Sequence, residues 1–328
     1  MKIAVLGPGG VGGLLAGALW RSGSEVTVIA REDTAALISR QGLRVRSVLL
    51  GDFEARPRAL GSTSEPFEVM IVATKAAGLA AALDRVQRAP GLVLPLLNGL
   101  DHLELLRARF SPRTVLAGAI RVESDRSEPG VIVHSSPFLL VDMAARDRAC
   151  GAALQALGDD LERAGVPVRL GYPVTDRSEA EVMWSKLVRL NALACTTSAH
   201  DKLLGEIRST PALRAELVGA IEEACVVAQA EGASDVRAER AVEELDRAHA
   251  TLGSSMQRDI AAGREPELDA IPGAVLRAAA RHELGCPTIE GLVTLIEARI
   301  AERASAGEVS GVSERASAQV SSERRGGE

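Results

Sequence analysis

The first half of the chain alternates short apolar runs with segments that are long enough to form helices. The runs expected to be strands are Lys2–Leu6, Glu25–Ala30, Val69–Thr74, Gly91–Leu97, Val115–Val122 and Val131–Val141. A helix is expected over Leu14–Ser22, and a turn near Glu128–Gly130. Strands that are separated by helix-length segments pair in parallel through right-handed crossovers. This half is therefore predicted to be an α/β domain of the Rossmann type.

The hydrophobic pattern changes from about Thr175 onward. Strand-like runs disappear, and stretches rich in Ala, Leu, Glu and Arg follow helical periodicity over Leu213–Glu231, Ala238–Thr251 and Ile289–Ala304. We therefore predict an all-α second domain.

The predicted organisation has three parts. Residues 1–172 form the Rossmann-type domain, residues 173–305 form the helical domain, and residues 306–328 form a tail rich in Ser, Glu, Arg and Gly. The tail has too few apolar residues to offset the entropy lost on ordering, so we expect it to be disordered.

Composition and charge narrow the classes of partner. The 328 residues carry 38 Lys and Arg against 44 Asp and Glu, with no long basic run and only four Phe, two Trp and one Tyr. This balance argues against nucleic acid or an anionic membrane as the main partner. Residues 3–20 carry no charge, but Pro8 and six glycines suit a tight turn better than a signal peptide or a membrane span. We expect a soluble, cytoplasmic protein.

The turn after the first strand is the first candidate site. It reads Gly7-Pro8-Gly9-Gly10-Val11-Gly12 and fits G-x-G-x-x-G, directly after a strand and at the start of a helix. Gly7 permits the tight turn, Gly9 lets the backbone approach a pyrophosphate, and Gly12 lets the helix pack closely on the strand. The N–H groups at the start of the helix then favour an anion. The turn predicts a dinucleotide site.

The residue after the second strand bears on which dinucleotide is bound. Folds that bind NAD usually have Asp or Glu at this position, to hold the ribose 2′-hydroxyl. Here the residue is Arg31, whose guanidinium suits a 2′-phosphate. Glu32 and Asp33 follow at once, so NAD stays open, although capping of the next helix is their expected role. We favour NADP.

Polar residues stand at the ends of two further strands and in one apolar helix. Lys75 follows the third strand and Asn98 the fourth, at the edge of the sheet where the cofactor is expected. In Trp184-Ser185-Lys186-Leu187, a lysine lies within an otherwise apolar helix. Desolvation makes an amine a better proton donor near neutral pH, whereas a lysine whose amine reaches water would do no chemistry. These residues alone do not decide between the two roles.

Together with a later run, these segments resemble the ketopantoate reductase family (2-dehydropantoate 2-reductase). The run is Ser254-Ser255-Met256, Asp259-Ile260, Gly263-Arg264 and Glu267-Leu268-Asp269. The resemblance extends to about Arg299. It implies NADPH-dependent reduction of a small 2-keto acid, with 2-dehydropantoate reduced to pantoate for pantothenate biosynthesis.

The resemblance also implies roles for individual residues. The Gly7–Gly12 turn and Arg31 hold the cofactor phosphates, while Lys75 and Asn98 lie near the nicotinamide ribose and Asn98 also touches the substrate. Lys186 is the proton donor to the ketone oxygen. Ser255 binds the substrate carboxylate, and Glu267 contacts cofactor or substrate near the reacting carbon. Ser124 is a weaker match to a cofactor contact.

Two departures from the family pattern concern the substrate. The family has Asn four and eight residues after the lysine, where this chain has Leu190 and Ala194; Asn191 comes five residues after it. One residue turns a helix by about 100°, so Asn191 points elsewhere unless a local bulge restores it as a substrate contact. Pro272 replaces another family Asn. The substrate could therefore be a different 2-keto acid.

Two alternative functions remain open from the sequence. One is another two-domain dehydrogenase of the hydroxyacid or opine type, although the run from Ser254 to Asp269 is not expected there. The other is a non-catalytic dinucleotide sensor, against which Lys186 and Glu267 count.

The remaining polar residues give less information. We assign no metal, because the five His are scattered. His102 could approach the cofactor, but we expect it at the exposed start of a helix. The four Cys contain no C-x-x-C pair and are expected to be buried small hydrophobes. The helical domain could form a homodimer, although no heptad pattern requires it.

Overall fold

The computed structural model describes residues 1–303, which form two compact units. The first unit contains Met1–Leu187 and Ala228–Val236, and the second contains Val188–Val227 and the described residues from Arg237 onward. The division falls inside helix α6 (Glu179–His200), whereas the expected boundary at residues 172 and 173 precedes that helix. The predicted tail, residues 306–328, lies outside the described residues.

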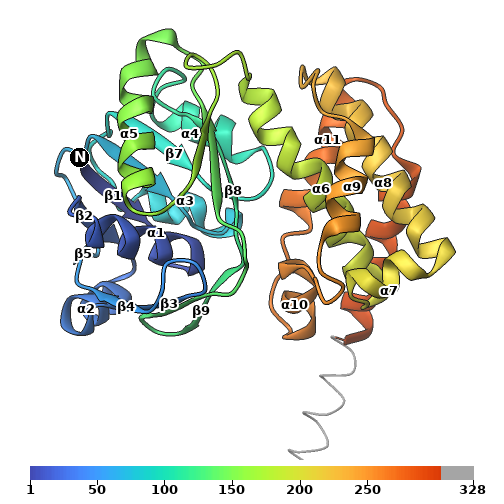
Figure 1. Cartoon of the computed structure of the whole chain (residues 1–328), viewed down its shortest axis with the longest axis horizontal. Coiled ribbons are helices and arrows are strands. Elements are labelled where there is room, and N and C mark those ends of the chain that lie inside the picture. The colour runs from blue at the N-terminus through green and yellow to red at the C-terminus, as the bar shows by residue number, and fades with distance from the viewer. Residues whose placement is uncertain (304–328) are drawn as a thin grey trace, which may run out of the picture. The chain divides into compact units, whose positions relative to one another are not determined.

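The first unit is built on a five-stranded parallel sheet (Figure 1). Its strands, in spatial order, are β5 (Arg58–Leu60), β2 (Glu25–Ile29), β1 (Lys2–Leu6), β6 (Val69–Val72) and β7 (Leu92–Pro95). Leu6 pairs with Ile29 on one side and with Val72 on the other. The chain thus leaves β1 in one direction and returns to its opposite side, which is where open parallel sheets bind ligands.

Helices cover both faces of this sheet, which explains why its strands are apolar at nearly every position. Ile3 and Val5 face a core shared with α1 (Gly10–Arg21), α2 (Glu32–Gln41) and α5 (Gly151–Arg163). Ala4 and Leu6 face the opposite core, shared with α3 (Leu79–Leu83) and α4 (His102–Arg109). The four expected strands that lie in this sheet, and the Rossmann-type fold of the first half, are confirmed.

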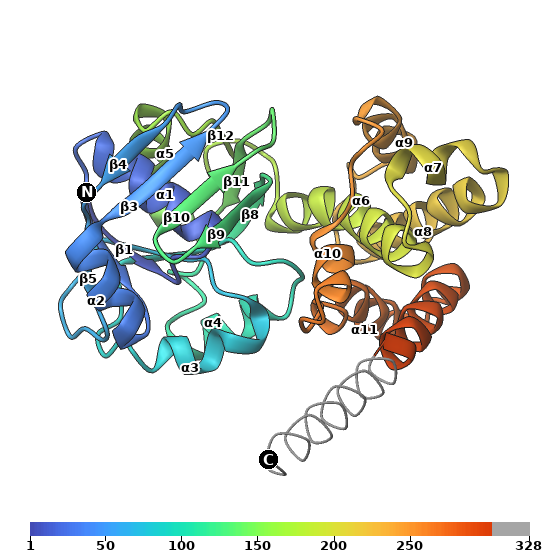
Figure 2. The same cartoon turned by 90° about the horizontal axis from the view of Figure 1, so that it is seen from below.

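Two smaller sheets complete the first unit (Figure 2). One has the order β4 (Phe53–Ala55), β3 (Leu43–Ser47), β10 (Val131–His134) and β9 (Ser124–Glu128). The other has the order β12 (Val168–Leu170), β11 (Leu140–Ala144) and β8 (Ala117–Arg121). The first of these packs on α1, where a Cβ at Gly13 would lie 2.5 Å from Ile132 Cδ1.

The prediction of a single strand over Val131–Val141 is wrong. The segment forms β10 in one sheet and β11 in another, with Pro137 in the interruption between them. Proline has no backbone N–H to donate to a ladder, so strand pairing does not run through it. In the interruption, Ser136 Oγ instead donates to the Phe138 carbonyl at 2.7 Å.

The second half is helical, as expected. After α6 come α7 (Leu204–Ser209), α8 (Pro211–Ala230), α9 (Ala238–Arg247), α10 (Ser255–Ala261), the π-helical turn η3 (Asp269–Gly273) and α11 (Ala274–Arg281). Residues 287–303 form a further helix, and the described chain has no strand after β12. None of the described helices combines the length and apolar character that crossing a membrane requires.

Candidate active site

The glycine-rich turn after β1 adopts a conformation that only glycine accommodates easily. Gly7 has φ of +91°, and its N–H donates to the Ile29 carbonyl of the neighbouring strand at 3.0 Å. A Cβ at Gly12 would lie 2.1 Å from the Gly7 carbonyl oxygen. Gly7 therefore allows the turn itself, and Gly12 allows α1 to begin directly against that turn.

Gly9 differs from these two glycines, because a Cβ there would meet nothing within 4 Å. It is the N-cap of α1 and makes no side-chain cap, and the first turn of that helix carries no acidic residue. The first N–H groups of a helix have no acceptor within it and carry a partial positive charge. The open space at Gly9 and these N–H groups form a cradle that suits a pyrophosphate.

Ser124 lies against the same turn from β9. Its Oγ donates to the Gly10 carbonyl at 2.9 Å, and a Cβ at Gly10 would lie 1.9 Å from the Ser124 carbonyl oxygen. Glycine is needed at position 10 because β9 passes so close. Ser124 thus supports the cradle, while direct contact with a cofactor stays a prediction.

Arg31 and Glu32 differ in their partners at the end of β2. Arg31 is the exposed N-cap of α2, and its guanidinium makes no ion pair with any described residue. Glu32 Oε1 accepts a hydrogen bond from Arg85 Nη1 at 2.9 Å. A hydrogen bond to its own backbone N–H and the pairing with Arg85 lower the pKa of Glu32. The acidic residue is therefore held by a neighbour, and the basic one is available.

Lys75 and Asn98 stand at the carboxyl ends of the adjacent strands β6 and β7, at the same edge of the sheet as the glycine turn. Lys75 is exposed, and Asn98 is partly buried. Lys186 Nζ, in the third turn of α6, donates a hydrogen bond to Asn98 Oδ1 at 2.7 Å. Two residues singled out from distant parts of the sequence therefore meet, and both belong to the first unit.

His102 is buried, so the expectation of an exposed helix start is wrong. His102 is the first residue of α4 and is only 5% exposed. Neither ring nitrogen has a hydrogen-bond partner among residues 1–303, although the nearby Asn98 carbonyl favours the protonated ring. Burial, and then the charge of Lys186, lower the pKa of His102 to about 4. The imidazole beside Lys186 is therefore neutral at physiological pH.

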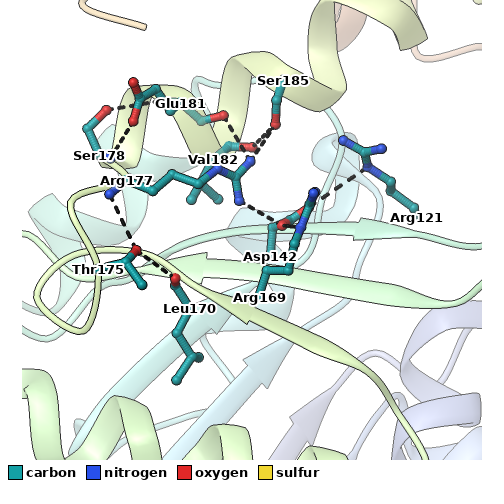
Figure 3. A network of polar contacts seen from close by, with 10 residues as sticks. All are labelled: Arg121, Asp142, Arg169, Leu170, Thr175, Arg177, Ser178, Glu181, Val182 and Ser185. Carbon is teal, nitrogen blue, oxygen red and sulfur yellow. Dashed lines mark hydrogen bonds and ion pairs between the residues drawn. The ribbon is translucent and has the colours of Figure 1, made fainter. Parts of the chain in front are cut away.

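The start of α6 rests on a network that the sequence did not reveal (Figure 3). Asp142 is fully buried in β11 and accepts hydrogen bonds from Arg169 Nε at 2.6 Å and from Arg177 Nη1 at 2.7 Å. Arg121 Nε lies 3.8 Å from the same carboxylate. Burial would raise the pKa of Asp142, but Arg169 and Arg177 lower it. The only sequence signal was a charged residue inside an apolar strand.

Within the second unit, α6 is α-helical through Asn191, so no bulge brings that side chain onto the face of Lys186. Asn191 is fully buried; its Oδ1 accepts from Cys195 Sγ at 3.5 Å, and its Nδ2 has no partner among the described residues. Leu190 is partly exposed and Ala194 is buried. A substrate contact by Asn191 stays a prediction.

The later motif divides its serines between two roles. Ser254 is the buried N-cap of α10: its Oγ accepts from Gln257 N at 3.0 Å and from Thr197 Oγ1 at 2.9 Å. Ser255 is the first residue of that helix and is partly exposed. Of the two serines, only Ser255 has appreciable accessible surface, and its contact with a substrate stays a prediction.

The rest of the motif forms the loop that carries Glu267. Arg264 Nε donates to Asp259 Oδ1 at 2.8 Å, which closes the loop after α10. Glu267 is partly exposed and precedes η3, in which Pro272 is buried. Ser255 and Glu267 belong to the second unit, whereas Lys186 and Asn98 belong to the first.

The remaining candidates are a metal site and the four cysteines, of which Cys150 is only partly buried, contrary to expectation, and the other three are buried. Within residues 1–303, no three His, Cys, Asp or Glu side chains gather closely enough to hold a metal ion. Burial raises the pKa of Cys195 to about 12 and the pKa values of Cys225 and Cys286 to about 11, so these thiols stay protonated.

The family models and the curated relatives that this chain matches agree on one protein family. Residues 3–141 match the family model of ketopantoate reductase PanE/ApbA, and residues 180–300 match the model of its C-terminal part. The uncharacterized oxidoreductase YkpB of Bacillus subtilis is 30% identical over 92% of this chain and 100% of its own length. The 2-dehydropantoate 2-reductase of Halobacterium salinarum is 28% identical over 92% of this chain and 99% of its own.

Among solved structures, D-mandelate dehydrogenase with NADH and anilino(oxo)acetate has a TM-score of 0.80 at 20% identity, over 92% of this chain and 99% of that one. At this identity the likeness concerns the fold alone. The two family models span most of the described chain and both halves of the fold. The chain is therefore an oxidoreductase that belongs to the ketopantoate reductase family.

Proposed function

We propose that the protein reduces a small 2-keto acid with NADPH, and that 2-dehydropantoate, giving pantoate, is the first substrate to test. The observation that carries the proposal is the contact between Lys186 and Asn98, at the sheet edge that also holds the glycine turn. This contact holds an ammonium group beside the expected nicotinamide end of a dinucleotide.

The residues fit a dinucleotide. The space at Gly9 and the N–H groups at the start of α1 would hold the pyrophosphate, with Gly7, Pro8, Gly10, Val11 and Gly12 shaping the turn. Lys75 and Asn98 would hold the nicotinamide ribose, and Ser124 would steady the turn. When bound, the reduced nicotinamide supplies the hydride.

Arg31 supports NADP as the form used. The 2′-phosphate is a dianion, and the Arg31 guanidinium is free to pair with it, whereas Glu32 is held by Arg85. D-mandelate dehydrogenase, which shares the fold, is solved with NADH, so both cofactors belong in the test.

Lys186 performs the proton transfer in this proposal. Negative charge grows on the ketone oxygen as its carbon accepts the hydride, and the ammonium of Lys186 stabilises this charge and donates the proton. Asn98 Oδ1 orients that ammonium. Ser255 binds the substrate carboxylate and Glu267 acts near the reacting carbon, whereas the fully buried Asn191 would contact the substrate only if its side chain turned toward the face of Lys186.

The substrate panel should extend beyond 2-dehydropantoate. Leu190 and Ala194 offer no amide at the two positions where the family has one, and Pro272 removes a third. An apolar Leu190 on the lysine face of α6 favours a less polar side chain on the keto acid.

The test is a steady-state assay of the purified protein with a series of small 2-keto acids, each with NADPH and with NADH. We expect turnover of at least one acid and a higher kcat/KM with NADPH. Tight NADPH binding without turnover of any keto acid would instead support a dinucleotide sensor. Turnover of opine or 3-hydroxyacid substrates alone would support the other dehydrogenase class.

A further inference from the structure

The first turns of α6 are fixed to the small three-stranded sheet by one arginine. Arg177, whose Nη1 binds the buried Asp142, donates from Nη2 to Ser185 Oγ at 2.7 Å and to the Glu181 carbonyl at 3.3 Å (Figure 3). Its planar guanidinium has several donors in fixed directions, so one side chain spans the strand and the helix. Arg177 therefore ties β11 to α6 directly before Lys186.

The same end of the helix is held at two more points. Ser178 and Glu181 form a reciprocal cap, in which Ser178 N donates to Glu181 Oε2 at 2.7 Å and Glu181 N donates to Ser178 Oγ at 3.2 Å. Glu179 pairs with Arg107 of α4 at 2.6 Å. These contacts all lie within the first unit, and they fix the rotation and the height of the first turns of α6.

Lys186 follows Ser185 and must place its amine 2.7 Å from Asn98 Oδ1. A lysine side chain is long and flexible, and much of its conformational entropy is lost when the amine is held at one point. A backbone that is fixed at Ser185 limits the positions that the Lys186 amine can reach. A mobile backbone at Ser185 would let the amine occupy a wider range of positions. Misplacement by about 1 Å can lower a rate by about 10²-fold.

We propose that Arg177, anchored on Asp142, is a positioning residue that holds Lys186 at Asn98 by fixing Ser185. The proposal rests on the proposed function for its kinetic consequence, but the placement of the Lys186 amine can be measured without turnover. Asp142 itself is a poor target, because removing a buried carboxylate among arginines usually destabilises the fold strongly.

The experiment compares Arg177→Met and Ser185→Ala with the conservative Arg177→Lys and Ser185→Thr. Ser185→Ala removes only the acceptor and leaves every charge in place. Arg169→Met is the matched control, because Arg169 binds the same carboxylate from β12. For each variant we measure Tm, kcat, the KM for NADPH, and the acylation rate of Lys186 relative to the partly exposed Lys202 by mass spectrometry.

We expect Arg177→Met to lower kcat about 10- to 100-fold, with the KM for NADPH unchanged, and Ser185→Ala to lower it less. Ser185→Thr keeps a hydroxyl at this position and should have the kcat of wild type. Arg169→Met should lower Tm but not kcat. Lys186 should be acylated several-fold faster in Arg177→Met.

A purely structural role would lower Tm in all the variants and leave kcat and the acylation ratio unchanged, which overturns the proposal. An equal loss of kcat in Arg169→Met would overturn it as well. If the wild-type protein turns over no keto acid, the proposed function fails, and the acylation ratio alone still decides the placement of Lys186.

Discussion

Lys186 Nζ lies 2.7 Å from Asn98 Oδ1, which joins two residues that are 88 positions apart in the chain. Asn98 is fixed by the end of β7, and Lys186 by the first turns of α6. Although α6 continues into the second unit, the lysine belongs to the first unit together with the glycine turn. The proposed proton donor is therefore carried by the same compact unit as the proposed cofactor cradle.

Replacement of Asn98 by Ala should lower kcat about 10- to 100-fold, because the Lys186 ammonium loses the acceptor that orients it. Steady-state kinetics with NADPH and the best keto acid would measure this. Gln155→Ala is the matched control, because that amide lies on the exposed face of α5 and bonds only Asp159 among the described side chains. An unchanged kcat in Asn98→Ala would show that the contact does not serve the reaction.

The glycines of the turn should separate binding from folding. Gly9→Ala places a methyl group in open space, so Tm should stay unchanged while the Kd for NADPH rises about tenfold or more, equivalent to about 1.4 kcal/mol. Gly12→Ala forces a Cβ to within 2.1 Å of the Gly7 carbonyl, which should cost about 1–3 kcal/mol of stability. Thermal unfolding and titration with NADPH test both. Equal NADPH affinity in Gly9→Ala and in wild type would show that the cofactor pyrophosphate does not bind at Gly9.

Arg31→Ala should raise the KM for NADPH about 10- to 100-fold and leave the KM for NADH nearly unchanged, since it removes a charge-assisted hydrogen bond to the 2′-phosphate. Arg40→Ala, an exposed arginine in the last turn of the same helix, is the control for a general loss of positive charge. A parallel loss with both cofactors would argue against recognition of the 2′-phosphate by Arg31.

His102 should make the fold sensitive to acid. Its pKa falls from 6.5 in the unfolded chain to about 4 in the fold, so between these values only the unfolded chain is protonated there. The stabilisation is complete above pH 6.5 and falls as the pH drops toward 4, by about 3 kcal/mol in total. Denaturant unfolding of wild type and His102→Leu would measure this, with the buried His134 present in both. Identical pH dependence in the two proteins would contradict the assignment.

The parallel sheet and the glycine turn could be predicted because their signals are local. An apolar run such as Lys2–Leu6, followed by closely spaced glycines, has few alternative structures. The strands β3 and β9 carry exposed charged side chains, and β3 follows the two-residue alternation of a half-buried strand. Their pairing with β10 joins segments far apart in the chain, which no local pattern indicates.

The environment of the site was harder to predict for the same reason. His102 begins a helix, a position that is often exposed, and it is buried because α4 lies against the start of α6. The role of Asp142 could not be predicted from its own segment, because Arg169 and Arg177, which bind its carboxylate, come from later segments. By contrast, the offset of Asn191 follows from helix geometry alone, and the uninterrupted α6 agrees with it.

The most direct test of the central claim is the single-turnover rate of hydride transfer in Lys186→Ala, with NADPH prebound and the best keto acid in excess. We expect a rate about 10²–10⁴-fold below that of wild type, with NADPH affinity unchanged, because the general acid is lost while the cradle remains. A rate equal to that of wild type would contradict the assignment of Lys186 as the proton donor.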